Sequence, residues 1–187
     1  MIELNELYHH GVKGQKWGVR RYQNPDGTLT DEGRKRNNVK SIMKSMTKDD
    51  LYNLGYSRRD LDHDTDYYMT DGKSVVNRII VKEGKTPVSF LDLEQYDYSD
   101  GTKIVNAIIG TRSGDKYRGK GYASKAVKEG LDWYESNKDK MGYSDINWGA
   151  RSTNKASQKL AEKHGFKKLD KQYEKGWVDY TYNKRRN

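Results

Sequence analysis

The sequence reads Tyr117-Arg118-Gly119-Lys120-Gly121-Tyr122-Ala123 at the point where a strand-like pattern gives way to a helical one. Residues 104–109 before it are mostly isoleucine and valine, which is typical of a β-strand. From the end of this run onward, apolar and small residues recur at positions 123, 126, 127, 130, 131 and 134, which predicts an amphipathic helix over residues 120–137. The chain therefore leaves a strand, passes through a basic glycine loop and enters a helix.

This junction predicts a phosphate site. A helix N-terminus has unpaired N–H groups and the positive end of the helix dipole, and glycines let the backbone approach phosphate oxygens closely. Arg118 and Lys120 add formal charge. The alternative is a basic, glycine-containing helix cap that binds nothing. The spacing fits neither the dinucleotide-binding fingerprint, with its three glycines in a parallel βαβ unit, nor the nucleotide P-loop.

The composition describes a polar chain with a compact part. Hydrophobic residues make up 33% and charged residues 34%, and the apolar residues concentrate after about residue 75. The net charge of +9 fits an anionic cofactor, nucleic acid binding or solubility alone. The absence of cysteine excludes disulfides, thiolate zinc sites and thiol nucleophiles. No apolar run approaches the ~20 residues that span a bilayer, so we expect a cytoplasmic protein without a membrane partner.

The chain divides into two parts. Residues 1–46 are rich in glycine and basic pairs, and we expect an extended basic arm with at most one short helix near its end. Within it, Asn24-Pro25-Asp26-Gly27 predicts a turn. Residues 47–187 are expected to form the folded domain.

The domain alternates helices and strands. A short helix starts at Thr47 as N-cap and stops by Gly55. A second helix follows Ser152 or Thr153 as N-cap and ends before Gly165. Strands are predicted at residues 75–81, 88–93, 104–109, 144–149, 166–173 and 177–183. Together with the helix over residues 120–137, this order predicts a mixed α/β fold with at least one parallel crossover.

Two motifs resemble those of the GNAT acetyltransferases. Arg118-Gly119-Lys120-Gly121-Tyr122-Ala123 is similar to the family's Arg/Gln-x-x-Gly-x-Gly/Ala signature. Asn154-Lys155-Ala156-Ser157-Gln158-Lys159-Leu160-Ala161-Glu162-Lys163-His164-Gly165-Phe166 resembles its later motif, Asn-x-x-Ala/Ser-x-x-Leu-Tyr-Glu-Lys-x-Gly-Phe. The element order over residues 47–184 is also similar. The resemblance implies a mostly antiparallel central sheet, splayed between its fourth and fifth strands, with helices on both faces. It further implies an acetyl-CoA-dependent N-acetyltransferase, an acyltransferase.

The resemblance also implies a cofactor site. Ile108 and Ile109 would lie beside the pantetheine arm, and Asn154, with Ser157 nearby, would contact it from the following helix. The backbone amides of the glycine loop would hold the pyrophosphate. The loop residues are Arg118, Gly119, Lys120, Gly121, Tyr122 and Ala123.

The catalytic groups are less defined. The family often has a tyrosine as general acid where this chain has Ala161, and Tyr173, or Ser157 through water, could substitute. Asp92 and Glu94 share one face of a strand, so either could be the base, with Glu94 our candidate; a solvated strand face is the alternative. Deprotonation assisted by the substrate also remains open.

The acceptor would be an amine. An acidic stretch, residues 58–71, would border the acceptor pocket in this fold and would favour a cationic acceptor, such as a protein lysine, an N-terminus or a small amine. A solvated loop is the alternative. Its aspartates match a calcium loop only in part, because Thr65 replaces the glycine and Asp71 the final glutamate, so we expect no metal.

The segment over residues 10–30 resembles one that recurs in phage-encoded proteins of Gram-positive hosts. The resemblance implies a phage or prophage origin and a tag that binds a structural or packaging partner through residues 9–30. Basic residues interleaved with Trp17 and Tyr22 could instead bind nucleic acid. The alternative function is therefore a CoA-binding, virion-associated or nucleic-acid-binding protein that uses a GNAT fold without catalysis.

Overall fold

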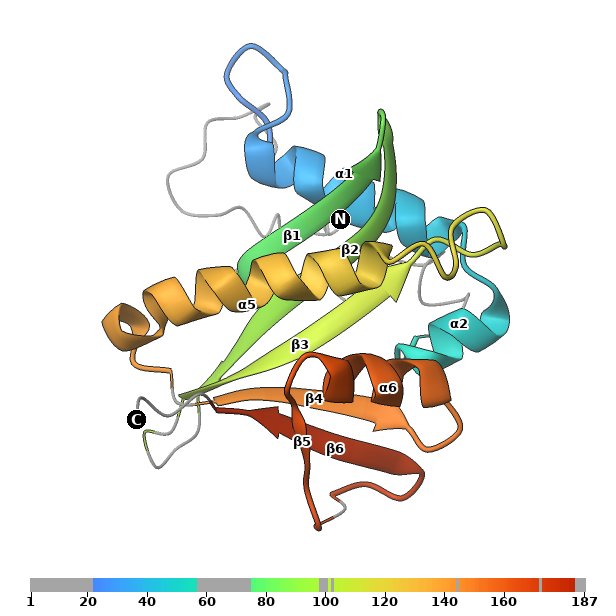
Figure 1. The fold of residues 1–187 in the computed structure, drawn as a ribbon. Coiled ribbons are helices and arrows are strands. Elements are labelled where there is room, and N and C mark those ends of the chain that lie inside the picture. The colour runs from blue at the N-terminus through green and yellow to red at the C-terminus, as the bar shows by residue number, and fades with distance from the viewer. Residues whose placement is uncertain are drawn as a thin grey trace, which may run out of the picture.

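The computed structural model describes residues 22–56, 75–97, 101, 103–143, 145–171 and 173–183. In these ranges one six-stranded sheet has the order β1-β2-β3-β4-β6-β5 (Figure 1). The strands are β1 (Val75–Glu83), β2 (Thr86–Asp97), β3 (Lys103–Thr111), β4 (Asp145–Arg151), β5 (Lys167–Lys168) and β6 (Trp177–Tyr182). The helices are α1 (Asp31–Lys44), α2 (Lys48–Asn53), α5 (Tyr122–Met141) and α6 (Lys155–Lys163).

The sheet is antiparallel except between β3 and β4. These two strands are parallel and joined by the α5 crossover, and they pair over only three positions, from Ile104↔Asp145 to Asn106↔Asn147. Beyond Asn106 the two strands diverge, while β3 remains paired with β2 up to Thr111 and β4 with β6 up to Arg151. The predicted mixed α/β sheet with a splayed junction is therefore confirmed, but among the described strands the junction lies between the third and fourth and not between the fourth and fifth.

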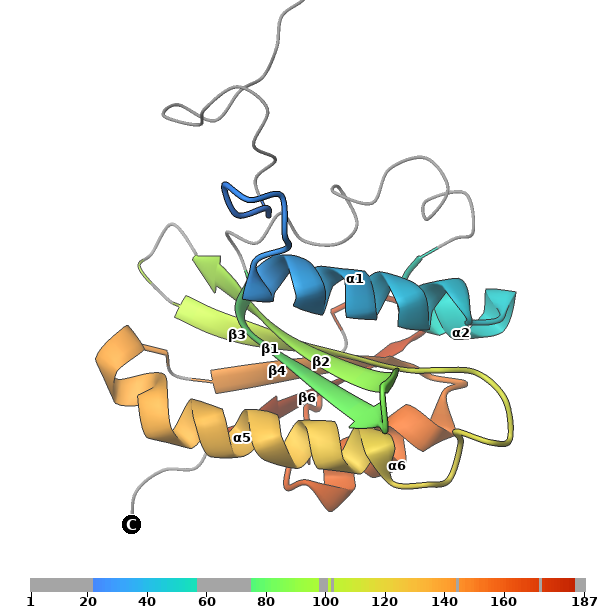
Figure 2. The ribbon, with the colours of Figure 1, turned by 90° about the horizontal axis from the view of Figure 1, so that it is seen from above.

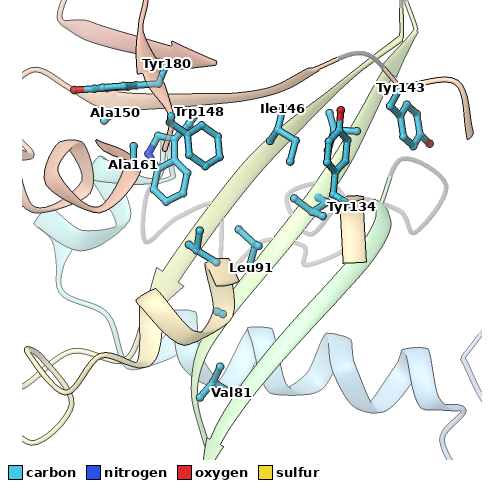
Figure 3. Close-up of a cluster of buried hydrophobic side chains, with 14 of the residues drawn as sticks. Val81, Leu91, Tyr134, Tyr143, Ile146, Trp148, Ala150, Ala161 and Tyr180 are labelled. Atoms are coloured by element: carbon cyan, nitrogen blue, oxygen red, sulfur yellow. The ribbon is translucent and has the colours of Figure 1, made fainter. Parts of the chain in front are cut away.

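Helices cover both faces of the sheet, as Figure 2 shows. The α5 and α6 face holds the larger core, in which Trp148, Tyr134 and Tyr180 are among the largest buried side chains (Figure 3). The α1 and α2 face holds a second core of Val39, Ile42, Met43, Met46, Leu51 and Phe90. The two cores therefore pack on opposite faces of the sheet in which β3 and β4 diverge.

Helix α1 corrects the predicted arm. It runs over 14 residues near the end of this arm, where at most one short helix was expected, and it contributes Val39, Ile42 and Met43 to the second core. Thr30 caps it by accepting a hydrogen bond from the Gly33 N–H. The folded unit therefore begins before residue 47. The charged residues of α1 concealed this, because the buried stripe is only one face of a basic helix.

Several local predictions are confirmed. Thr47 begins α2 with a capping box in which Asp50 is the reciprocal partner. The turn at residues 24–27 closes with a hydrogen bond of 2.9 Å from the Gly27 N–H to the Asn24 carbonyl, and Gly27 has a φ of 83°. The predicted aspartate-rich connection, residues 58–71, lies outside the described residues.

Other boundaries differ from the prediction. The cap of α6 is Asn154 rather than Ser152 or Thr153, since its side chain accepts from the Ser157 N–H. Helix α5 begins at Tyr122 because Gly121 takes a left-handed φ of 79°. The strand predicted at residues 166–173 is reduced to β5. After Leu169, whose N–H donates to the Asp179 carbonyl, the chain leaves the ladder.

Candidate active site

A cleft of about 1260 Å³ lies where β3 and β4 separate. It passes from one face of the sheet to the other. One half, the α6-side half, is lined by Ile109, Tyr122, Ser124, Asn154, Ser157 and Lys163. The other, the α2-side half, is lined by Asn53, Leu54, Asn106, Asn147, Gly149, Trp177 and Asp179. A ligand as long as a coenzyme can therefore reach both faces from a single site.

Two glycines shape the loop before α5. Gly119 has a φ of 69° and Gly121 a φ of 79°, in the left-handed region that favours glycine. A Cβ added at either position would meet no atom within 4 Å, so the requirement is conformational and not spatial. Among the described residues no side chain caps α5, and the Lys125 N–H donates to the Gly121 carbonyl at 2.9 Å. Donors of the first turn therefore face the cleft, as a phosphate cradle requires.

Arg118 is held at this loop by α2. Its guanidinium forms an ion pair with Asp50, which also accepts hydrogen bonds from Thr47 and Ser113. Burial opposes ionisation of Asp50, but these hydrogen bonds and Arg118 together lower the pKa of its carboxyl. The side chain of Arg118 is still 56% exposed and free to meet an anion. Lys120 is exposed and does not line the cleft.

Two hydrogen bonds fix the first turn of α5. The Tyr122 hydroxyl donates to Glu83 at 2.7 Å, which raises the pKa of the tyrosine. The Ser124 hydroxyl lies 2.8 Å from Nε2 of His164, at the end of α6. Burial, with a smaller effect of Lys163, lowers the pKa of His164. The α5 N-terminus is therefore tied both to the sheet and to α6.

Helix α6 presents a hydroxyl to the cleft. The Ser157 oxygen accepts a hydrogen bond of 3.0 Å from the Trp148 indole, so its own proton is left to donate elsewhere. Asn154 uses its side-chain oxygen to cap α6. Ala161, in the position where the family often has tyrosine, is completely buried in the larger core. Tyr173 lines the cleft and is 70% exposed.

The outer part of β3 offers an open backbone edge. Ile108 and Ile109 both line the cleft, each packed against a different core. Because β4 separates from β3 after Asn147, the β3 edge that faces the cleft has no strand partner within the described ranges, and its backbone N–H and C=O groups are open. Such an edge can pair with the amide groups of an extended ligand.

The candidate base is not placed in the cleft. Asp92 is buried and binds the Arg78 guanidinium through both oxygens at 2.8 Å. Glu94 is only 3% exposed and lies opposite Asn106 in the pairing of β2 with β3. Asn106 lines the cleft, whereas Glu94 does not. The two-residue spacing correctly put both carboxylates on one face, but it could not show how deeply they are covered.

Sequence reasoning missed part of the lining. Asn147, Gly149, Trp177 and Asp179 all border the cleft, together with Tyr117 at the start of the predicted loop. The alternation of β6 put Trp177 and Asp179 on one face, but only the pairing of β6 with β4 brings that face to the cleft. A register between distant strands has no local sequence signal.

Two features are absent from the described residues. None of the helices they form combines the length and the apolar character that membrane crossing requires. No group of three or more His, Cys, Asp or Glu side chains within this part of the chain could hold a metal ion.

Comparison with solved structures shows the fold. An N-acetyltransferase from Staphylococcus aureus Mu50 superposes with a TM-score of 0.60 at 17% identity, covering 80% of this chain and 93% of that one. A protein from Streptococcus mutans UA159 gives 0.59 at 21% identity, with 80% and 94% covered. A putative acetyltransferase from Salmonella typhimurium, solved with its cofactor acetyl-CoA, gives 0.55 at 13% identity, with 78% and 89% covered.

Two family models match the sequence. Residues 4–24 match a family of unknown function, DUF7211. The search of curated proteins found no match. The model of the acetyltransferase (GNAT) domain matches residues 19–167, which is well over half of the chain. Its match begins upstream of α1, in agreement with the packing of that helix against the sheet. The chain therefore belongs to the GNAT acetyltransferase family.

Proposed function

We propose that the protein is an N-acetyltransferase that transfers the acetyl group of acetyl-CoA to an amine. The observation that carries this proposal is the cleft at the β3–β4 divergence. It combines an open strand edge with an uncapped helix N-terminus behind left-handed glycines. These two features suit the two halves of the cosubstrate, because an extended amide-containing arm can pair with the edge and a pyrophosphate can accept N–H donors.

The residues have distinct binding roles in this proposal. The amides of residues 119–124 and the Arg118 guanidinium bind the pyrophosphate, and Lys163 adds a second positive charge on the same side of the cleft. The backbone of Ile108 and Ile109 pairs with the pantetheine arm. Asn154, Ser157 and Leu160 enclose the arm from α6. Acetyl-CoA supplies an activated acetyl thioester.

The transfer step needs a donor for the leaving group and an acceptor for the amine proton. The amine nitrogen attacks the thioester carbonyl carbon, the C–S bond breaks, and the sulfur leaves as a thiolate. Ser157 is the better donor candidate, because Trp148 fixes its oxygen and leaves its proton available. Tyr173 is the other candidate, on the exposed loop before β6. Glu94 would act as base only through a water, which the neighbouring Asn106 could orient, given the burial of the carboxylate.

A CoA-binding protein without catalysis is the second candidate function. Two observations favour it: Ala161 is a core residue where an acid is often found, and Glu94 does not reach the cleft. Binding and turnover must therefore be measured separately.

The test begins with calorimetric titration of the full-length protein with acetyl-CoA. The proposal expects one saturable site per chain, followed by release of free CoA when an amine is added. Binding without CoA release from a broad amine panel would favour the non-catalytic alternative. The absence of binding would overturn both.

We also propose that residues 9–30 bind a phage structural or packaging partner and that the gene belongs to a phage or prophage. The support is the resemblance of this segment to phage-encoded proteins and its mixture of basic and aromatic residues. Residues 22–30 form a turn docked on α1, where the Thr30 N–H donates to the Tyr22 carbonyl at 2.9 Å. Deleting residues 1–21 should leave acetyl-CoA binding intact and abolish capture by virion components; unchanged capture would contradict the proposal.

A further inference from the structure

The two halves of the cleft have opposite electrostatic character. Arg118, in the loop before α5, and Lys163, in the last turn of α6, are the basic residues among the described lining side chains. Asp50 and Asp179 are the acidic ones. Asp50 is already committed to Arg118, Thr47 and Ser113. Asp179 is therefore the carboxylate that gives the α2-side half its charge.

The register of β4 and β6 fixes where Asp179 points. Trp148 and Tyr180 face the α5 and α6 core, and they are paired across the two strands. Side chains alternate along a strand, so the neighbouring pair, Gly149 and Asp179, faces the other side of the sheet. A Cβ at Gly149 would lie 3.7 Å from Asp179 Oδ1 and 3.4 Å from the Trp177 ring. The carboxylate and the indole thus flank the bare backbone of Gly149.

Asp179 has no basic partner within the described part of the chain. Its Oδ2 accepts a hydrogen bond of 3.3 Å from the Tyr173 N–H, and Oδ1 is not fully buried. Arg151 lies on the same face, but its guanidinium stacks on the rings of Tyr52 and Trp177, at 4.3 and 4.1 Å from their centroids. A half-buried carboxylate without a cation is stabilised by a ligand that brings one.

The geometry points to Asp179 as the group that binds the acceptor, and to a cationic alkylamine as the acceptor class. The ammonium group would donate to Asp179 Oδ1 over the open floor at Gly149, beside the Trp177 ring. It would then lie in the same continuous cleft as the β3 edge, on the face opposite the phosphate loop. This inference rests on the proposed function, because it assigns the second substrate of that same site.

Three variants test the assignment. Asp179→Asn removes the charge but keeps an oxygen that can accept from the Tyr173 N–H. Gly149→Ala fills the floor with one methyl group in ordinary contact with its neighbours and with no backbone penalty, since Gly149 does not have a positive φ. Asp170→Asn is the matched control: it removes the same charge from an exposed position near β5, outside the cleft.

The probes are putrescine and N-α-acetyl-lysine amide, with neutral aniline as the contrasting amine. Release of CoA is measured at saturating acetyl-CoA, and acetyl-CoA affinity is measured separately by calorimetry. We expect transfer to both alkylamines and not to aniline. Asp179→Asn should raise KM for the alkylamines about 10- to 100-fold, the size expected for a hydrogen bond to a charged group. Gly149→Ala should raise the same KM, while acetyl-CoA affinity stays within about twofold in all three variants.

The possible failures are distinguishable. A wild-type protein that does not bind acetyl-CoA overturns the proposed function and this inference with it. A protein that binds acetyl-CoA but transfers to aniline, or to none of the probes, overturns only the inference. Equal KM values for Asp179→Asn and Asp170→Asn would also overturn it.

Discussion

Replacing Gly121 with alanine tests the phosphate loop with the least disturbance. The added methyl group meets no atom within 4 Å, so the substitution acts through the backbone alone. Gly121 has a φ of 79°, and a left-handed conformation costs a residue with a Cβ about 1–2 kcal/mol. If the free loop relaxes out of that conformation, binding must restore it, and the affinity for acetyl-CoA should fall about 5- to 30-fold.

Gly142→Ala provides the matched control. Gly142 ends the same helix with a φ of 71°, and a Cβ there also meets no atom within 4 Å. The same conformational cost should lower the melting temperature of this variant by about 2–8 °C and leave acetyl-CoA affinity unchanged. Calorimetric titration and thermal unfolding of both variants complete the assay. If Gly121→Ala bound acetyl-CoA as tightly as the wild type, the reasoning about the loop would be refuted.

Three further predictions follow from other parts of the structure. Ser157→Ala should lower kcat about 10²-fold or more with little change in acetyl-CoA affinity. An unchanged kcat would rule out Ser157 as the general acid and leave Tyr173 as the candidate, which Tyr173→Phe would test. Because burial lowers the pKa of His164, the folded state favours the neutral ring. Stability from this group is therefore complete above the unfolded pKa of about 6.5 and is lost as the pH falls toward the folded value. The free energy of unfolding in urea, measured between pH 7.5 and 5, should therefore depend less on pH in His164→Asn than in the wild type. Equal acid sensitivity of the two proteins would contradict this. Gly33→Ala should destabilise the protein by about 1–3 kcal/mol, although alanine is the better helix former, because its Cβ would lie 2.6 Å from the Tyr22 carbonyl oxygen; an unchanged or higher melting temperature would be inconsistent with docking of this turn on α1.

The sequence predicted those parts of the fold that have local signals. The glycine loop, the amphipathic pattern of α5 and the Thr47 cap each follow from neighbouring residues, and the structure has all three. The cap of α6 was displaced by two residues or fewer, because Ser152, Thr153 and Asn154 can all cap a helix and only the fold selects among them. Helix α1 was underestimated since its buried face is narrow and most of its residues are polar.

The site was predictable only where a motif carries it. Nine of the predicted cofactor-binding residues, from Ile108 to Ser157, line the cleft, and all nine belong to the two motifs or to the strand before the loop. Asp179 and Gly149 lie in separate strands, and they become neighbours only through the antiparallel register of β6 with β4. Glu94 shows the opposite case: the alternation of β2 placed it on the right face, but burial beside Asn106 keeps it out of the cleft.

Amide hydrogen exchange with and without saturating acetyl-CoA tests the central claim most directly. The claim is that the cosubstrate binds where β3 leaves β4, with its pyrophosphate on the first turn of α5. The account predicts new protection at residues 107–109 and at residues 119–124, with little change at the Gly142 end of α5. Protection confined to other segments, or no protection at ligand saturation, would contradict it.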